Sequence, residues 1–419
     1  MSEIGARLAE LKELGLYRRT RLVSGPQGPN VVLDGQPVLL LCSNNYLGLA
    51  DHQKVQEAAA DAALRWGVGT GSSRLVSGTM TIHGRLEQRL AAFKGTPTAL
   101  LFGSGYLANL GVVGALARVS EVVFSDELNH ASIIDGCRLS RAATFIYRHN
   151  DVEHLAWGLK QAEGRGSLIV TESVFSMDGD VAPLEEIADL ARRYGVRIVV
   201  DEAHGTGCLG PGGRGAVAEA GLEGLIDVVV GTLGKALGSY GAYVACDEDI
   251  AALLVNSARP LIFSTAPPPP VVAGALAALE LLEEQPRRVE RLQANAEVLR
   301  TELAREGFDI AGSSTQIVPI IVGEASTAMR VCEAALARGV FAQAIRPPTV
   351  PDGTSRLRLA VMATHTKGEL REAARVLGRA ALQAGFRPAT AIPVAVAQER
   401  ARPGAPLVSA PPPRRADAA

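Results

Sequence analysis

Two short segments of the sequence each place a chemically active side chain directly after an apolar run. Residues 197–204 read RIVVDEAH, in which Asp201 ends the run and His204 follows three residues later. Residues 227–235 read DVVVGTLGK, in which Lys235 follows an apolar run and several small residues. If both runs are strands of an open α/β sheet, their polar groups meet at the carboxyl edge, where such sheets bind ligands.

An aspartate and a lysine that converge at such an edge suit pyridoxal phosphate. The aldehyde of this cofactor needs a lysine amine to form an imine, and Lys235 can supply it. The ring nitrogen stays protonated and acts as an electron sink when a carboxylate such as Asp201 pairs with it. Residues 103–106 (GSGY) follow another expected strand and precede a helical pattern, so their backbone N–H groups can hold a phosphate.

The elements that position these groups follow from hydrophobic patterning. From about residue 55 to 280, short apolar runs alternate with helical patterns such as 184–194, and several runs are continuously apolar, as in a sheet covered on both faces. The expected strands are 98–102, 121–124, 144–147, 167–171, 197–200, 227–230 and 241–245. This alternation predicts a doubly wound, mostly parallel sheet.

The flanking regions suggest further units. We expect an N-terminal helix over 2–22 within an arm of residues 1–50, a large domain over 51–285, a smaller α+β domain over 286–385 and a disordered tail over 386–419. Between the domains, PPPP at 267–270 precedes a long helix over 271–306 that is interrupted near Pro286. The smaller domain is expected to contain strands at 316–322 and 356–362 and helices at 326–338 and 367–383.

Composition narrows the class of protein. The 419 residues are 47% hydrophobic and 21% charged, which is too apolar for a disordered chain, and 42 basic against 44 acidic residues give no signature of nucleic-acid binding. Five scattered cysteines form no C-x-x-C pair, and neither a disulfide framework nor a metal site is expected. The N-terminus lacks the apolar core of a signal peptide, and no stretch approaches the roughly 18 apolar residues of a membrane span, so we expect a cytoplasmic protein.

A glycine pattern offers a competing interpretation. Residues 205–210 (GTGCLG) fit G-x-G-x-x-G after a strand, as in dinucleotide-binding folds. Such a site needs the first glycine at the strand end and a helix that opens across the motif. Here Asp201 to His204 intervene and Pro211 follows, which argues against nicotinamide binding.

The segment VDEAHGTGCLGPGGRG (200–215), followed by GTLGKALG (231–238), resembles the α-oxoamine synthases. These pyridoxal phosphate enzymes of fold type I condense an amino acid with an acyl thioester and release carbon dioxide. The resemblance extends from about residue 16 to 383 and includes SNNYLGL (43–49), GTGSSRLVSG (69–78), FSDELNHASIIDG (124–136), TESVFSMDGDVAPL (171–184), FSTAPPP (263–269) and IRPPTVPDGTSRLRLA (345–360). It implies an aspartate aminotransferase-like fold, with a large, mostly parallel seven-stranded sheet domain and a smaller α+β C-terminal domain.

The resemblance also implies roles for residues around the cofactor. Lys235 would form the imine, and Asp201 would pair with the pyridinium nitrogen. His130 would stack on the ring face, and both His204 and Ser176 would contact the phenolic oxygen. Together with Lys235, the residues His130, Asp201 and His204 form the expected catalytic set.

Phosphate and substrate contacts follow in the same way. The phosphate-binding residues implied by the resemblance are Gly105, Tyr106 and Thr232, with Ser264 and Thr265 reaching it from the neighbouring subunit of a homodimer. The substrate-binding residues are Arg358 for the carboxylate, with Arg356 as the alternative if the register is off by two, Asn44 near the same carboxylate, and Arg18 near the acyl-thioester entry.

The block IRPPTVPDGTSRLRL is most similar to one branch of this family. That branch joins L-alanine to a pimeloyl thioester, carried by CoA or by a carrier protein, in biotin biosynthesis. One alternative is another α-oxoamine synthase that uses glycine or a different amino acid with a different acyl-CoA, such as a 2-amino-3-ketobutyrate ligase. An alternative from a different class is a binding protein on this fold without catalytic activity.

Overall fold

The computed structural model describes residues 2–388, so the tail expected to be disordered lies almost wholly outside the described residues. The α-helices are α1 (Glu3–Glu13), α2 (Gln53–Trp66), α3 (Thr81–Lys94), α4 (Gly105–Leu116), α5 (Ala131–Ser140), α6 (Val152–Gln161), α7 (Leu184–Tyr194), α8 (Ala216–Glu219), α9 (Glu248–Ser257), α10 (Arg259–Ile262), α11 (Pro269–Glu284), α12 (Arg287–Arg305), α13 (Ala325–Leu336) and α14 (Lys367–Gln383). The strands are β1 (Val23–Ser24), β2 (Asn30–Leu33), β3 (Gln36–Leu40), β4 (Thr98–Phe102), β5 (Val122–Asp126), β6 (Ala143–Tyr147), β7 (Gly166–Glu172), β8 (Arg197–Asp201), β9 (Val228–Thr232), β10 (Ala242–Cys246), β11 (Ile317–Gly323), β12 (Val340–Phe341), β13 (Gln343–Ile345) and β14 (Ser355–Ala360).

Seven of these strands form the sheet on which the predicted site depends. Their order is β4-β10-β9-β8-β7-β5-β6, and every neighbouring pair is parallel except those that β10 makes with β4 and β9. The structure therefore confirms the seven expected strands, with ends that differ by at most two residues. These runs could be recognised from sequence because they are mostly apolar, and β7, β8 and β9 are also rich in β-branched residues.

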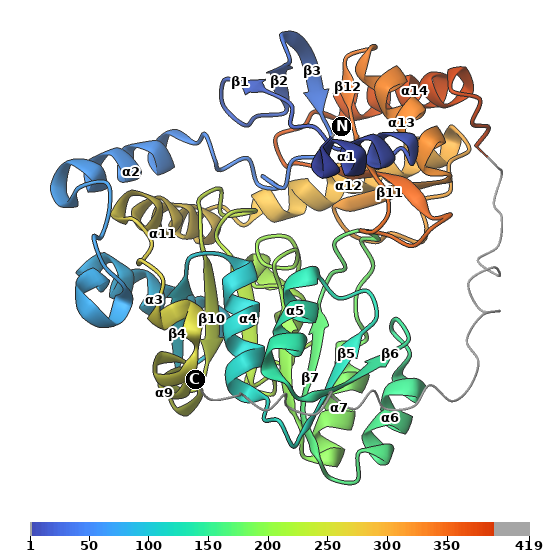
Figure 1. Cartoon of the computed structure of the whole chain (residues 1–419). Coiled ribbons are helices and arrows are strands. Elements are labelled where there is room, and N and C mark those ends of the chain that lie inside the picture. The colour runs from blue at the N-terminus through green and yellow to red at the C-terminus, as the bar shows by residue number, and fades with distance from the viewer. Residues whose placement is uncertain (1, 389–419) are drawn as a thin grey trace.

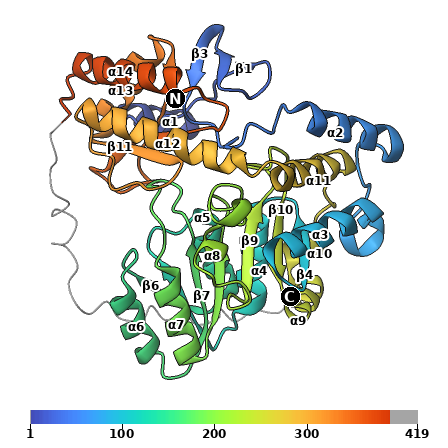
Figure 2. The same ribbon diagram turned by 180° about the vertical axis from the view of Figure 1, so that it is seen from behind.

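Helices cover both faces of the sheet, so alternate strand residues belong to two separate cores (Figures 1 and 2). On the face covered by α4, α5 and α9, Val199, Val228 and Val244 pack with residues of these helices. On the opposite face, Ile198 and Val229 join a larger core that continues beneath α3 and α7. Burial on both sides holds the strand ends in fixed positions.

The smaller part of the molecule lies above the large sheet in Figure 1 and contains two further sheets. One has the order β11-β14-β13, and in the other β12 pairs in parallel with β3 at the end of the order β1-β2-β3-β12. The N-terminal arm therefore packs with elements that are 300 residues away in sequence. The long helix expected over 271–306 is confirmed as α11 and α12, which are separated at Pro286.

The N-terminal helix expected over 2–22 is wrong in extent. It ends at Glu13, and Gly15 adopts φ +67°, a left-handed conformation that glycine reaches at little cost. The backbone N–H groups of Leu16 and Tyr17 then both donate to the carbonyl of Leu11. This turn places Arg18 in an extended arm outside the helix.

The G-x-G-x-x-G segment at 205–210 forms a close-packed turn. A Cβ at Gly207 would lie 2.5 Å from the Cβ of Ala236, and one at Gly210 would lie 2.3 Å from the carbonyl oxygen of Gly215. These glycines bring two stretches of backbone together beside the lysine-bearing loop. The segment leads into a short 3₁₀ turn at Pro211–Gly213, and no long helix opens across it.

Candidate active site

Four of the segments that carry predicted site residues leave the same edge of the seven-stranded sheet. Strands β4, β9, β8 and β7 run in one direction, because β10 is antiparallel to both β4 and β9. In the register, Ala242 pairs with both Phe102 and Thr232, and Asp201 pairs with Glu172. The ends of these four strands therefore lie along one edge, with only the start of β10 between β4 and β9, and the loops that follow them form one site.

Lys235 and His204 meet at this edge. The Nζ of Lys235 lies 2.8 Å from Nε2 of His204, and the hydroxyl of Tyr46 lies 2.7 Å from Nδ1 of the same ring. Burial lowers the pKa of Lys235 to about 8, although the carboxylates of Asp201 and Glu172 oppose this shift. Burial, followed by the charge on Lys235, lowers the pKa of His204 well below its usual value.

Arg358 reaches the same group of side chains from β14 of the smaller part. Its Nε donates to the backbone carbonyl of Ser176, its Nη1 to Oδ1 of Asn44 (3.1 Å) and its Nη2 to the hydroxyl of Tyr46 (3.3 Å). The residue is 7% exposed, and among the described residues it forms no ion pair with a carboxylate. A buried guanidinium held only by neutral acceptors is suited to bind the carboxylate of a ligand.

Arg356, two residues earlier on the same strand, has a different environment. Its Nη1 forms an ion pair with Asp178, and its Nε donates to the carbonyl of Thr354 at 3.1 Å. A carboxylate of the protein thus already neutralises this guanidinium. The structure therefore favours Arg358 over Arg356 as the carboxylate-binding arginine.

The carboxylate of Asp201 is buried and held by two donors. Its Oδ1 accepts the backbone N–H of Ala203 at 2.8 Å, and its Oδ2 accepts the side-chain amide of Asn109 at 2.6 Å. The amide of Asn109 also donates to Oγ of Ser132, which lies 2.7 Å from Nδ1 of His130. His130 is exposed at the N-terminus of α5, so a ligand can reach its ring.

The predicted phosphate cradle lies at the N-terminus of α4. Ser104 is the N-cap of this helix, and its hydroxyl accepts the N–H of Leu107 at 3.2 Å, while Gly105 has no atom within 4 Å of its Cβ position. Free N–H groups and open space at a helix N-terminus favour an anion. The Tyr106 hydroxyl bonds to Asp135, and the Thr232 hydroxyl donates to the carbonyl of Gly241 at 3.1 Å.

Three predicted site residues lie apart from this cluster within the single chain. Ser264 and Thr265 follow α10, and within the described residues neither side chain forms a hydrogen bond. Arg18 is exposed, and its Nη2 donates to the carbonyl of Pro347 at 3.1 Å. The structure of one chain therefore places no contact between these three residues and Lys235.

Sequence reasoning missed three buried residues that complete the site. Tyr46 contacts Asn44, His204 and Arg358, and Asn109 supports Asp201. Glu172 is fully buried beside Asp201, and burial, aided by the charge of Asp201, raises its pKa to about 8. Asn109 could have been noticed as a polar residue inside the apolar helix sequence LANLGVVGAL.

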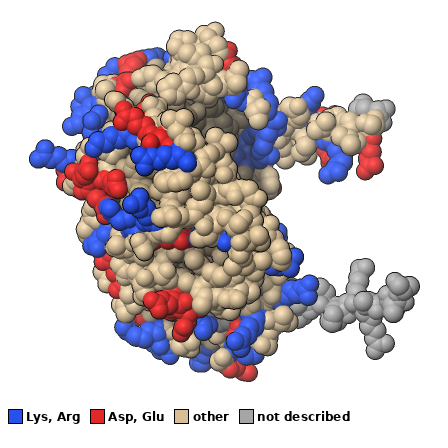
Figure 3. Space-filling view, turned by 90° about the vertical axis from the view of Figure 1, so that its left-hand side faces the viewer, with Lys and Arg blue, Asp and Glu red and all other residues tan. Residues whose placement is uncertain are grey.

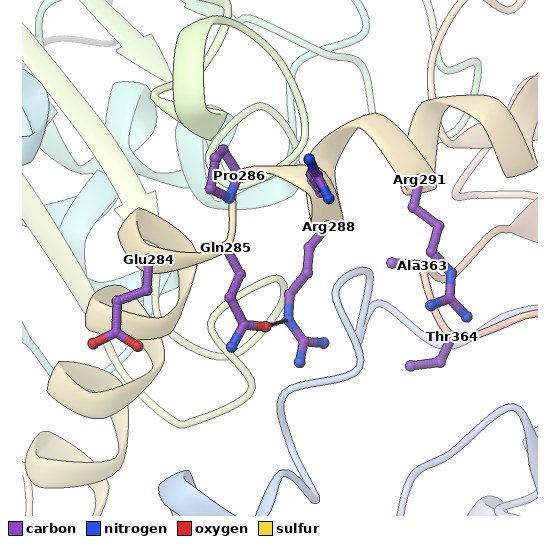
Figure 4. Close-up of a pocket in the computed structure, with 8 residues that line it drawn as sticks. Glu284, Gln285, Pro286, Arg288, Arg291, Ala363 and Thr364 are labelled. Atoms are coloured by element: carbon purple, nitrogen blue, oxygen red, sulfur yellow. Dashed lines mark hydrogen bonds between the residues drawn. The ribbon is translucent and has the colours of Figure 1, made fainter.

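A separate pocket of about 500 Å³ lies where α11 meets α12, against the turn at Ala363 and Thr364 (Figure 4). Arg288 and Arg291 extend into it, and the Nε of Arg288 donates to the side-chain oxygen of Gln285 at 2.8 Å. None of the predicted site residues lines this pocket. We therefore place the active site at the sheet edge.

The residues at the sheet edge fit pyridoxal phosphate. Lys235 provides an amine whose pKa is lowered by burial, and the donor-supported Asp201 provides an anion in a dry environment. The open N-terminus of α4, which follows the end of β4 at the same edge of the sheet, provides an anion site. These three features match the aldehyde, the ring nitrogen and the phosphate of the cofactor.

Comparison with known proteins agrees with this geometry. Residues 36–377 match the model of the family described as aminotransferase class I and II. The chain belongs to this family of pyridoxal-phosphate-dependent transferases of fold type I.

The curated relatives of the chain are more specific. The 8-amino-7-oxononanoate synthase of Geobacter sulfurreducens is 52% identical over 386 residues, which cover 91% of this chain and 99% of the relative. The 8-amino-7-oxononanoate synthase of Anaeromyxobacter dehalogenans is 52% identical over 367 residues, covering 88% and 92%. The resemblance noted from sequence motifs is thus confirmed over nearly the whole described chain.

Solved structures show the same fold. Serine palmitoyltransferase from S. paucimobilis, with a bound PLP–myriocin aldimine, is 34% identical and superposes with a TM-score of 0.87, covering 92% of this chain and 98% of that chain. The 8-amino-7-oxononanoate synthase of Francisella tularensis is 27% identical with a TM-score of 0.73, covering 83% and 99%. The expected aspartate aminotransferase-like fold is confirmed.

Proposed function

We propose that this protein condenses L-alanine with a pimeloyl thioester to give 8-amino-7-oxononanoate, carbon dioxide and a free thiol, a step of biotin biosynthesis. Relatives with this name that are half identical over nine-tenths of the chain support the reaction. The observation that carries the proposal is the buried, unpaired guanidinium of Arg358, linked through Tyr46 and His204 to the amine of Lys235. This arrangement suits an amino acid whose carboxylate binds Arg358 while its α-carbon lies near Lys235.

Pyridoxal phosphate, when bound, supplies an electron sink that stabilises negative charge on the α-carbon of the amino acid. Lys235, His204 and Asp201 would hold it by its aldehyde, phenolic oxygen and ring nitrogen, with Ser176 as a further contact to the phenolic oxygen. His130 would stack on its ring. Gly105, Tyr106 and Thr232 would bind its phosphate.

Lys235 moves the proton of the reaction. A pKa of about 8 leaves a substantial neutral fraction near neutral pH, so the freed amine can remove the α-proton of alanine. Arg358 and Asn44 hold the alanine carboxylate during this step. The α-carbon then attacks the thioester carbonyl and expels the thiolate, which takes a proton from solvent. The carboxylate is lost as carbon dioxide, and the α-carbon takes back a proton from the ammonium of Lys235. Arg18, on the exposed arm, would contact the acyl thioester.

We also propose that the protein acts in the cytoplasm as a homodimer whose subunits share the active site. Figure 3 shows broad areas of uncharged side chains across the middle of the face turned to the viewer, with charged side chains most numerous at its left and lower edges. The exposed apolar residues of the chain include Leu64, Val68, Leu75, Val76 and Phe263. A second copy could cover them and bring its Ser264 and Thr265 to the phosphate.

No described helix is long and apolar enough to cross a membrane.

Two experiments test the proposed assembly and the domain limits. Sedimentation at twice the chain mass of 43.8 kDa would support the dimer, and sedimentation at the chain mass would contradict it. The domain limits 51–285 and 286–385 remain a proposal, which limited proteolysis within 280–290 would test.

Product identification by mass spectrometry tests the reaction directly. The loaded protein is incubated with L-alanine and either pimeloyl-CoA or pimeloyl carrier protein, and the expected product is 8-amino-7-oxononanoate with release of carbon dioxide. Parallel reactions with glycine or serine and other acyl-CoA thioesters test the other branches of the family. Turnover only in those reactions would overturn the proposed substrates, and a protein that takes up no cofactor would indicate a non-catalytic role.

A further inference from the structure

A continuous chain of hydrogen bonds joins Asp201 to His130 beneath the site. The amide nitrogen of Asn109 donates to Oδ2 of Asp201 at 2.6 Å and to Oγ of Ser132 at 2.9 Å, and Oγ of Ser132 lies 2.7 Å from Nδ1 of His130. Asn109 and Ser132 are 1% and 0% exposed, so water does not compete for these bonds. Three elements meet here, because Asn109 lies on α4, Ser132 on α5 and Asp201 at the end of β8.

The orientation of the Asn109 amide is set by its neighbours. The opposite orientation would place its carbonyl oxygen against the carboxylate of Asp201, so the NH₂ group must face Asp201. In the observed orientation Oδ1 of Asn109 is buried without a hydrogen-bond partner. The protein thus leaves one buried acceptor unsatisfied to keep both amide hydrogens on Asp201 and Ser132.

The direction of the remaining bonds follows from counting hydrogens. The Ser132 hydroxyl accepts from Asn109 and has its own hydrogen left for Nδ1 of His130. The backbone N–H of Ser132 also donates to Nδ1 at 3.2 Å, the helix-capping bond of α5. Two donors therefore face Nδ1, which must act as an acceptor.

We propose that Asn109 and Ser132 are positioning residues that lock His130 in the neutral form with its proton on Nε2. His130 then offers a hydrogen-bond donor at Nε2 and cannot act as a base through Nδ1. One edge of the His130 ring packs against the protein although the residue is exposed overall, and this partial loss of water lowers its pKa. The charge of Asp201 opposes the shift, but its direction agrees with a neutral ring. This inference deepens the proposed function, on which it rests for the contacts of His130 and Asp201 with the cofactor.

The tautomer can be measured without turnover. The chain has seven histidines, and ¹⁵N-resolved NMR of the cofactor-free protein, with His130→Gln for assignment, reports which ring nitrogen carries the proton. We expect an unprotonated Nδ1 and a protonated Nε2 at neutral pH. A proton on Nδ1, or on both nitrogens, overturns the proposal, whatever reaction the protein catalyses.

A double-mutant cycle in the loaded enzyme tests whether the chain acts as a unit. Asn109→Ala and Ser132→Ala should each lower kcat by about 3- to 10-fold and change the KM for the amino acid by less than about twofold. The kcat of the double variant should be no lower than that of the less active single variant. Losses that multiply overturn the proposal. Ser140→Ala, which removes a buried hydroxyl bonded to the carbonyl of Cys137 on the same helix, is the matched control and should leave kcat unchanged. If Asn109→Ala fails to fold, the tautomer measurement still decides.

Discussion

The Nζ of Lys235 lies 2.8 Å from Nε2 of His204, and among the described residues neither group hydrogen-bonds to a carboxylate. Burial lowers the pKa of Lys235 to about 8, although the charges of Asp201 and Glu172 oppose this shift. Burial, followed by the charge of Lys235, lowers the pKa of His204 well below its usual value. The folded protein thus prepares a lysine amine that is reactive close to neutral pH.

Lys235→Ala should abolish turnover and cofactor attachment. The loaded protein should show the visible band near about 420 nm that such lysine-bound cofactors share, and the variant should lack it. Borohydride reduction followed by peptide mass spectrometry should find the cofactor on Lys235 in the native protein. A cofactor trapped covalently on the variant would falsify the assignment of this lysine.

The pH dependence of cofactor attachment should report the same amine. Since the pKa of Lys235 is lowered to about 8, the rate of borohydride-trapped attachment should rise with pH below this value and level off above it. An ordinary lysine would keep gaining reactivity up to its usual value of 10.5. A rate that climbs steadily to that pH would contradict the lowered pKa.

Replacing Arg358 and Arg356 in turn should separate substrate binding from structure. Arg358→Gln removes an unpaired buried guanidinium, and we expect the KM for L-alanine to rise by about 10- to 100-fold. Arg356→Gln breaks the ion pair with Asp178, so we expect a lower melting temperature and a nearly unchanged KM. Steady-state kinetics and thermal denaturation of both variants distinguish the two roles. The reverse pattern would assign the carboxylate to Arg356.

Tyr46→Phe should weaken catalysis without a large loss of stability. Its hydroxyl contacts His204, Asn44 and Arg358, and removing a group that aligns these residues should lower kcat/KM by about 5- to 10-fold. Tyr243→Phe is the matched control, because Tyr243 is equally buried and its hydroxyl lies 2.8 Å from Oγ1 of Thr206. Equal losses of activity in both variants would show that Tyr46 has only a packing role.

His149→Gln should destabilise the protein in a pH-dependent way. Nδ1 of His149 lies 2.9 Å from Asp126 and Nε2 lies 2.7 Å from Asp180. Burial alone would lower the pKa of His149, but the hydrogen bonds to these carboxylates outweigh it and raise the pKa to about 10.

The sign follows from this raised pKa. The stabilisation that protonated His149 gives to the folded protein is fully present below 6.5, the pKa of this histidine in the unfolded chain, and is lost as the pH rises towards 10. The difference in melting temperature between the native protein and the variant should therefore narrow from pH 6.5 to 10. In His154→Gln, the control, the gap should stay constant over the same range, because burial lowers the pKa of His154. A gap for His149→Gln that is constant from pH 6.5 to 10 would contradict the ion-pair cluster.

Much of the large sheet could be predicted from sequence, because most of its strands are continuous apolar runs. Such a run can be recognised from consecutive residues alone, without knowledge of the fold. Asp201 and Lys235 could be found for the same reason, since each closes or follows such a run. The N-terminal helix was overextended because its apolar and basic pattern continues past Gly15, and the left-handed turn there depends on the local backbone.

The choice between Arg356 and Arg358 could not be made in this way. The two arginines lie on the same strand two residues apart and so share a face of the sheet. Only the fold brings Asp178 to one of them and Asn44 and Tyr46 to the other, from positions at least 178 residues away in sequence. The chain of bonds from Asp201 through Asn109 and Ser132 to His130 likewise joins three elements. Residue type and local spacing define which groups can react, and packing between distant segments decides which charges are neutralised and which remain free for a substrate.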